Sequence, residues 1–244
     1  FITFLGGSLV SKKSEYYDMM RKTFKKSLET LGNAQSARGQ IPNAVHDFER
    51  RRPFVDYLSI DSTLWFLIGH YVYKKRYNDA SLFKKHKKII EKALVWLSYQ
   101  DAGEDLMLEQ LPTTDWQDAF PHKYGRTINT QALYYAVLRL FGKRSLANRL
   151  KFLVNEEKGA RLWSGKFYYA YRWKNHNRYK EIGDWFDSLG NLLAIVFGIA
   201  DEKRAKSILG YIKKNRVNKP YPVKTIYPAI RKGGKYWKDY YMGL

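Results

Sequence analysis

The chain has 244 residues, of which 45% are hydrophobic, so it can bury a sizeable core as one large domain or two small ones. It contains no cysteine, which excludes a disulfide framework and any thiolate nucleophile or metal ligand, and we expect a cytoplasmic protein. Its formal net charge is +21, and no apolar run reaches the roughly 20 residues of a membrane-spanning helix, so we expect no membrane insertion.

Apolar residues recur at three- and four-residue steps over much of the chain, which is the helical period. The expected helices are residues 14–31, 61–73, 81–99, 129–141, 145–154, 188–200 and 201–214. Segments 33–53 and 101–126 are expected to be loops, and the second of them carries acids beside aromatic residues. Only 166–171 and 223–227 have a β-like pattern, as extended loops or short hairpins. We therefore expect an all-α chain of helical hairpins.

The positive charge raises nucleic acid as a partner, because it attracts a polyanion over a long range. The basic residues are scattered in short groups along the whole chain, mostly where solvated helix faces are expected. No recognised nucleic-acid motif accompanies them, so a solubilising surface is the favoured interpretation. Lysines gathered on one face would favour the nucleic-acid alternative instead.

The segment Asp115-Trp116-Gln117-Asp118 places two acids beside an indole. A glycosidase needs a protonated carboxyl that donates to the leaving oxygen, and an apolar aromatic setting keeps a carboxyl protonated near neutral pH. Asp118, between Trp116 and Phe120, has that setting. The alternative is that Asp115 caps a turn and Asp118 pairs with a lysine.

Tryptophan also stands beside acids in Asp184-Trp185-Phe186-Asp187. Indole faces stack on sugar rings, although burial in a core is the common role of a single tryptophan. The five histidines show no metal-ligand spacing, so we expect neither a metal nor a cofactor. No phosphate-binding Gly-rich loop and no nucleophile elbow occurs, which disfavours nucleotide enzymes and α/β-hydrolases.

Four segments in order resemble those of neutral/alkaline invertases and of glycogen-debranching-type glucosidases. The longest begins Asp118-Ala119-Phe120-Pro121-His122-Lys123-Tyr124-Gly125-Arg126-Thr127-Ile128-Asn129-Thr130-Gln131-Ala132-Leu133 and ends at Arg139. The others are Ile60-Asp61-Ser62-Thr63-Leu64-Trp65-Phe66, Phe186-Asp187-Ser188-Leu189-Gly190-Asn191-Leu192-Leu193-Ala194-Ile195 and Tyr221-Pro222-Val223-Lys224-Thr225-Ile226-Tyr227-Pro228-Ala229.

This resemblance implies an (α/α)6 toroid, an inverting mechanism on an α-glucosidic or sucrose-type bond, and Asp118 as the general acid. It also implies a pocket for an oligosaccharide or disaccharide, lined by Asp61, Trp65, Gln131, Asp187 and Asn191. Asp115 and Trp116, in the same segment as Asp118, join this candidate substrate-binding set.

The chain departs from the family pattern in two places. Asn129 stands where the family usually has a glutamate, and no residue matches the family's general base. A complete toroid has twelve helices and about seven are expected here, so we expect residues 1–244 to form a single toroid domain truncated at both ends. The alternatives are a catalytically inactive carbohydrate-binding relative and, more weakly supported, a basic helical nucleic-acid binder.

Overall fold

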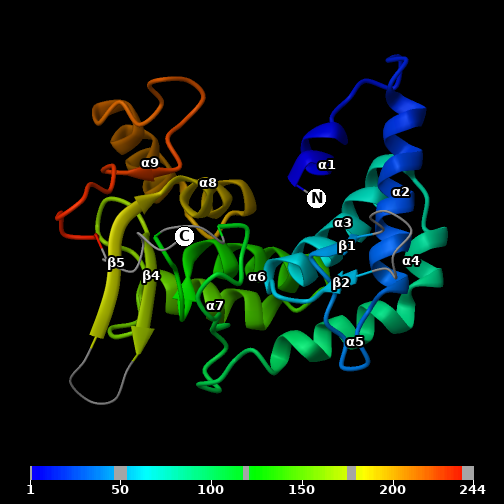
Figure 1. Cartoon of the computed structure of the whole chain (residues 1–244), viewed down its shortest axis with the longest axis horizontal. Coiled ribbons are helices and arrows are strands. Elements are labelled where there is room, and N and C mark those ends of the chain that lie inside the picture. Colours follow the sequence, from blue (N-terminus) through cyan, green and yellow to red (C-terminus); the bar gives the residue numbers. More distant parts are fainter. Residues whose placement is uncertain (1, 47–53, 118–120, 175–179, 238–244) are drawn as a thin grey trace. The chain divides into compact units, whose positions relative to one another are not determined.

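A computed structural model describes residues 2–46, 54–117, 121–174 and 180–237. The chain forms two compact units, Phe1–Gln100 and Asp101–Leu244, and each is described by itself. Both units contain helices and strands (Figure 1). None of the described helices combines the length and the apolar character needed to cross a bilayer.

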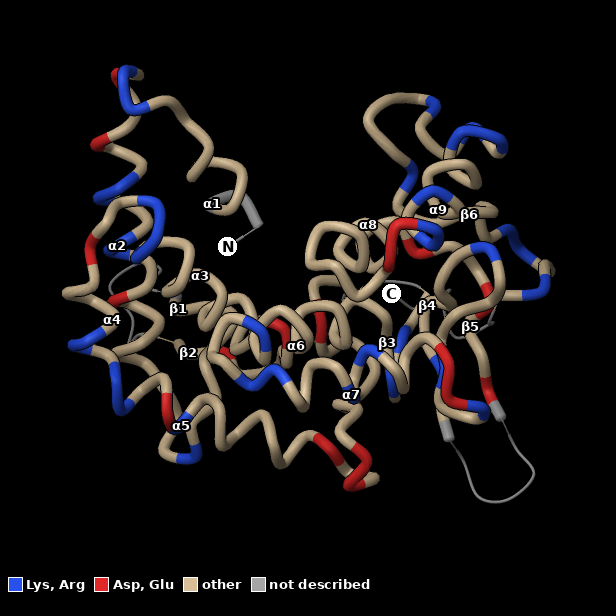
Figure 2. Tube along the Cα trace, turned by 180° about the vertical axis from the view of Figure 1, so that it is seen from behind, with Lys and Arg blue, Asp and Glu red and all other residues tan. Residues whose placement is uncertain are grey.

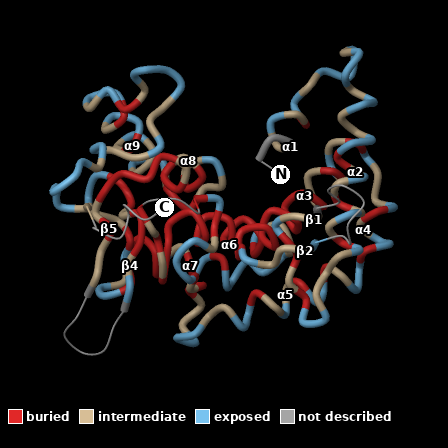
Figure 3. The backbone as a smooth tube through the Cα atoms, viewed as in Figure 1, coloured by how far each residue is buried: buried red, intermediate tan, exposed pale blue. Residues whose placement is uncertain are grey.

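The first unit is mainly helical. Its elements are α1 (Ile2–Gly7), α2 (Tyr17–Asn33), β1 (Ala44–His46), β2 (Phe54–Asp56), α3 (Asp61–Tyr77), α4 (Ser81–Lys85) and α5 (Lys87–Ser98). The apolar side of α2, with Phe24 and Leu28, is buried, and α2 packs on α3. The first ten residues of α3 are buried on all sides, so this helix forms the centre of the unit (Figure 3).

Two histidines form a hydrogen-bonded pair in the core of the first unit. Nδ1 of His70 lies 3.0 Å from the carbonyl oxygen of Phe66, which can only accept, so Nδ1 carries the proton. Nε2 of His70 therefore accepts from Nδ1 of His86, 3.0 Å away. Both rings are neutral in this arrangement, and burial lowers both pKa values, that of His70 to about 4.

The second unit is built around α6 (Ile128–Leu140). Eleven of its thirteen residues, Ile128 to Leu138, are buried, because α7 (Arg144–Asn155) and α8 (Ser188–Phe197) pack against it (Figure 3). The last helix of the unit, α9 (Glu202–Lys214), buries only Ile208 and Ile212. Helix α6 is thus the central core element of the second unit.

A four-stranded antiparallel sheet completes the second unit, with the order β3 (Arg126–Thr127), β4 (Tyr169–Lys174), β5 (Lys180–Asp187) and β6 (Ile226–Tyr227). Thr127 pairs with Tyr171, Tyr169 with Phe186, and Asp187 with Ile226. Strands β3 and β5 each run directly into a helix, α6 and α8. The sheet therefore brings the starts of these two helices together.

The expected all-α fold is wrong, and with it the (α/α)6 toroid. Most expected helices are present, although the predicted helix 81–99 is divided at His86 into α4 and α5, and α1 was not expected. Segment 180–187 was not recognised as a strand, and the expected loop 33–53 contains β1. Antiparallel pairing of β1 with β2, and of β5 with both β4 and β6, turned these segments into sheets, which yields a mixed α and β architecture.

Lysine and arginine occur on helices of both units, among them α2, α5 and α9 (Figure 2). Many of these side chains are exposed, as in the pair of Lys206 with Glu202, whose side chains are 75% and 82% exposed. Pairs of this kind contribute little to stability and keep the surface hydrated.

Candidate functional site

The candidate site lies where α6 and α8 begin. The hydroxyl of Thr127 caps α6 by accepting from Thr130 N, and the carboxylate of Asp187 caps α8 by accepting from Gly190 N at 3.3 Å. Gly190 allows the two ends to approach closely, since a Cβ there would lie 2.4 Å from Ile128 Cγ2 and 3.1 Å from Asn129 N. Residues 127–129 and 187–190 are therefore direct neighbours.

Lys123 lies at the centre of this site. Its Nζ is 2.9 Å from Asp187 Oδ2 and 3.2 Å from Asp115 Oδ2, and all three side chains are at most 1% exposed. Burial alone would lower the pKa of Lys123, but the two carboxylates outweigh it and raise this pKa, so the lysine is charged. One positive and two negative groups give the cluster a formal charge of −1.

Asn129 joins the cluster through both ends of its amide. Its Nδ2 donates to Asp115 Oδ2 at 3.1 Å, and its Oδ1 accepts from Lys123 Nζ at 3.3 Å. A glutamate at this position, as in the glycosidases that this segment resembles, could not donate in this way when ionised. The amide at Asn129 therefore accepts from Lys123 and donates to Asp115 at the same time.

The loop that carries the candidate acid is fixed at both ends. Asp115 Oδ1 accepts from Gln117 N at 2.9 Å, and Gln117 Nε2 donates to Pro121 O at 3.1 Å. Asp118, the predicted general acid, lies between these two residues in the sequence and outside the described residues. Trp116 is 38% exposed, and its ring centre is 5.5 Å from Lys123 Nζ.

Gln131 and Asn191, two predicted pocket residues, are fully buried and bind backbone groups. Gln131 Nε2 donates to Leu108 O at 2.7 Å. Asn191 accepts from Tyr168 N at 2.8 Å, and its Nδ2 donates to Tyr168 O and Asp187 O. These contacts position the loop before the site and the start of α8.

The remaining predicted residues, Asp61 and Trp65, lie on α3 in the first unit, 6% and 5% exposed. The structure thus brings Asp115, Trp116 and Asp187 together, with Gln131 and Asn191 on the helices behind them. The sequence interpretation did not assign a role to Lys123. The sequence feature that could have indicated its role is its place in a segment with two acids and an indole. A lysine in such a segment is usually solvated, so this feature alone does not predict burial.

The segment 221–229 contacts the end of β5 and the start of α8, next to the site. Ser188 N donates to Thr225 O at 3.1 Å, Ser188 Oγ donates to Lys224 O at 2.5 Å, and Phe186 pairs with Tyr227. Three of the four segments that resemble glycosidases therefore meet in the second unit. In the described residues, no three His, Asp or Glu side chains converge as metal ligands would.

No protein-family model matches the chain, and no curated protein matches it in sequence. The inference of a function therefore depends on the residues of this site.

Proposed function

We propose that this protein is an inverting glycoside hydrolase that acts on an α-glucosidic or sucrose-type bond, with Asp118 as the general acid. The observation that supports the proposal is that three resembling segments meet at Asp187, which binds Lys123 at 2.9 Å and pairs with Ile226. These segments are separated by dozens of residues in the sequence. The proposal depends on these residues and not on a toroid.

In the proposed reaction, Asp118 protonates the glycosidic oxygen as its bond to the anomeric carbon breaks. A water molecule bonds to that carbon from the opposite face and gives its proton to a general base, a role that no described residue is assigned. The transition state resembles an oxocarbenium ion, and a buried cluster with a formal charge of −1 would favour such a cation electrostatically. The half-exposed indole of Trp116 offers a flat face for the sugar ring. Asn191 and Gln131 act as positioning residues through the backbone groups they bind.

A second candidate function is sugar binding without hydrolysis. Inversion requires an ionised carboxylate that activates water. The two described carboxylates of the site, Asp115 and Asp187, are buried and bind Lys123, an amide and backbone N–H groups. Neither has the exposure that a base acting on water needs, and this burial is the observation that supports the second candidate.

Hydrolysis of sucrose, maltotriose and a branched dextrin separates these candidates. The chain, its Asp118→Asn variant and a matched Glu104→Gln variant in the same loop are compared by glucose release. An enzyme should keep its rate in Glu104→Gln and lose about 10²–10⁴-fold in Asp118→Asn, the usual contribution of a general acid. Undiminished hydrolysis by Asp118→Asn would contradict the assignment of the acid, and binding without turnover would favour the second candidate.

A further inference from the structure

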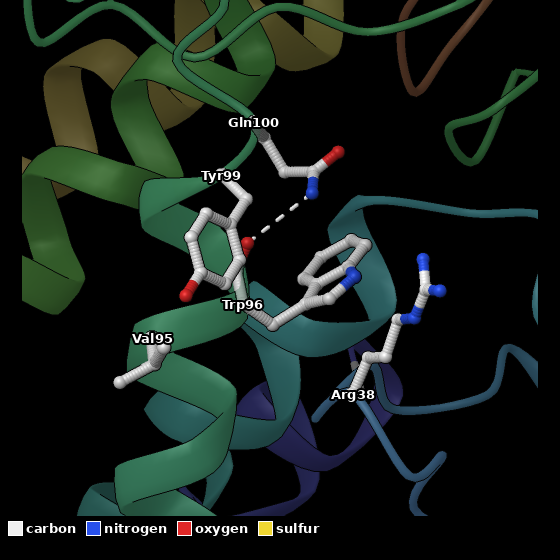
Figure 4. Close-up of a pocket in the computed structure, with 5 residues that line it drawn as sticks. All are labelled: Arg38, Val95, Trp96, Tyr99 and Gln100. Carbon is white, nitrogen blue, oxygen red and sulfur yellow. Dashed lines mark hydrogen bonds between the residues drawn. The ribbon is translucent and has the colours of Figure 1, made fainter.

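A hollow lies in the first unit, beside the end of α5. It measures about 530 Å³ and is lined by Arg38, Val95, Trp96, Tyr99 and Gln100 (Figure 4). This volume is within the roughly 300–1,000 Å³ of small-molecule sites. Four of the five residues come from the last turn of α5 and the two residues after it, and Arg38 comes from the loop after α2.

The loop that carries Arg38 is held firmly against α5. Gly39 has a φ of +103°, and a Cβ there would lie 2.3 Å from Lys92 O, so only glycine fits this approach. Gln35 Nε2 donates to both Gly39 O and Ile89 O, at 2.9 and 2.8 Å. Ser36 N and Gly39 N complete the turn through backbone bonds to Gln40 O and Ser36 O. Arg38 is therefore presented from a fixed backbone.

The side chains of the hollow offer mainly donors. Figure 4 shows the indole of Trp96 between Tyr99 and Arg38, with the indole nitrogen on the side of Arg38. Among the described residues, neither the Arg38 guanidinium nor the Trp96 indole N–H has a protein acceptor. The Gln100 amide nitrogen donates to Trp96 O at 3.2 Å, which leaves the amide oxygen as an acceptor among the lining side chains. None of the five lining residues is acidic.

A ligand complementary to this hollow has a negative group for the guanidinium and a ring face for the indole and the phenol. The guanidinium fork matches a carboxylate or phosphate with two parallel hydrogen bonds. Trp and Tyr rings combine an apolar face with a polar edge, which suits a ring that bears hydroxyl groups. A neutral apolar ligand would leave the unpaired donors without acceptors, which costs affinity.

We infer that this hollow binds an anionic saccharide, such as a uronic acid or a sugar phosphate, at a site separate from that of Lys123. Arg38 pairs with the anionic group, Trp96 and Tyr99 contact the ring, and Gln100 accepts from a sugar hydroxyl. The inference goes beyond the proposed hydrolysis and needs no residue of the second unit.

The test follows the indole N–H resonance of Trp96, assigned with Trp96→Phe, during titration of the full chain with glucuronate. Glucose and acetate are titrated as a neutral ring and a ringless anion. We expect a saturable shift with glucuronate and affinities about tenfold or more weaker for the other two, since a charge-assisted hydrogen bond contributes roughly 1.5–3 kcal/mol. Glucose 6-phosphate, titrated in parallel, distinguishes a phosphate from a carboxylate as the preferred anion.

Arg38→Met removes the guanidinium from an exposed position, so this variant is expected to fold. Lys92→Met, one turn earlier on α5 and outside the hollow, is the charge-matched control. Loss of the glucuronate response in Arg38→Met and its retention in Lys92→Met would support the inference. An equal response to acetate, or an unchanged response in Arg38→Met, would overturn it. Asp118→Asn should leave this response unaltered, so the result is independent of the proposed hydrolysis.

Discussion

Lys123 Nζ lies 2.9 Å from Asp187 Oδ2, although the two residues are 64 positions apart, and both side chains are completely buried. Asp187 also caps α8, and Lys123 also binds Asp115 and Asn129. One ion pair therefore connects the loop before α6 to the start of α8. This connection also holds Asp115, the residue before Trp116, beside the start of α8.

Replacement of Lys123 by methionine should strongly destabilise the chain, because it leaves two buried carboxylates without their cation. The expected loss in the free energy of unfolding is about 3–5 kcal/mol, measured by urea denaturation. Lys87→Met is the matched control, since Lys87 is 77% exposed and its pair with Glu91 spans 4.0 Å. That control should change stability by less than about 0.5 kcal/mol. A loss below about 1 kcal/mol for Lys123→Met would contradict this account of the cluster.

Asn129→Asp should also be costly at pH 7, because it adds a third carboxylate to one lysine and removes the donor to Asp115. We expect a loss of about 3 kcal/mol that shrinks as the pH is lowered from 7 to 5, since protonation of the introduced carboxyl restores a neutral donor. Asn148→Asp, at an exposed position of α7, is the control and should show little effect. Equal stabilities of the two variants across this pH range would argue against the role of the Asn129 amide.

Gly190→Ala tests the close approach of α6 and α8. The new methyl group would overlap Ile128 Cγ2 at 2.4 Å, so we expect a loss of about 1–3 kcal/mol and weaker sugar binding. Gly210→Ala, in exposed α9 with no atom within 4 Å of the added Cβ, should instead stabilise by up to about 1 kcal/mol. Thermal unfolding of both variants provides the comparison, and a stabilised Gly190→Ala would exclude the tight contact.

The His70 and His86 pair should make stability depend on pH. Burial lowers the pKa of His70 to about 4 from an unfolded value of 6.5, so the unfolded chain binds more protons between these values. Stability is therefore complete above pH 6.5 and falls as the pH is lowered toward 4, by about 3 kcal/mol for His70. Urea denaturation at several pH values should reveal this slope, and His70→Phe should lose most of it. A wild-type stability that is flat between pH 4 and 6.5 would show that His70 titrates normally.

The helices could be predicted from sequence because their apolar periods are local. The expected segments 129–141 and 201–214 differ by only a residue at either end from α6 and α9. The segment 223–227, which contains β6, was expected to be β-like, but β5 was not recognised, because Gly183 weakens its strand pattern and its second partner, β6, lies far away in the chain. Pairing between strands, which a local sequence pattern does not reveal, therefore decided the fold class.

In the candidate site, too, residues with a local sequence signal could be predicted, and a residue whose role depends on a distant partner could not. The acids Asp115 and Asp187 were identified beside their tryptophans, but their common partner was not. Lys123 is one of 44 basic residues, and no local pattern distinguishes a buried lysine from a solvated one. Its role depends on an aspartate 64 positions away, which only the three-dimensional structure brings within 2.9 Å.

The most direct test of the central claim is saccharide binding at Trp116, because both candidate functions require it. The indole N–H resonance of Trp116, assigned with Trp116→Phe, is followed in Asp118→Asn during titration with maltotriose and sucrose, so that hydrolysis cannot interfere. We expect a saturable shift of Trp116 with at least one of these sugars, while the resonance of Trp96 in the first unit stays unchanged. A Trp116 resonance that responds to neither sugar, or only in parallel with Trp96, would contradict a carbohydrate site beside Lys123.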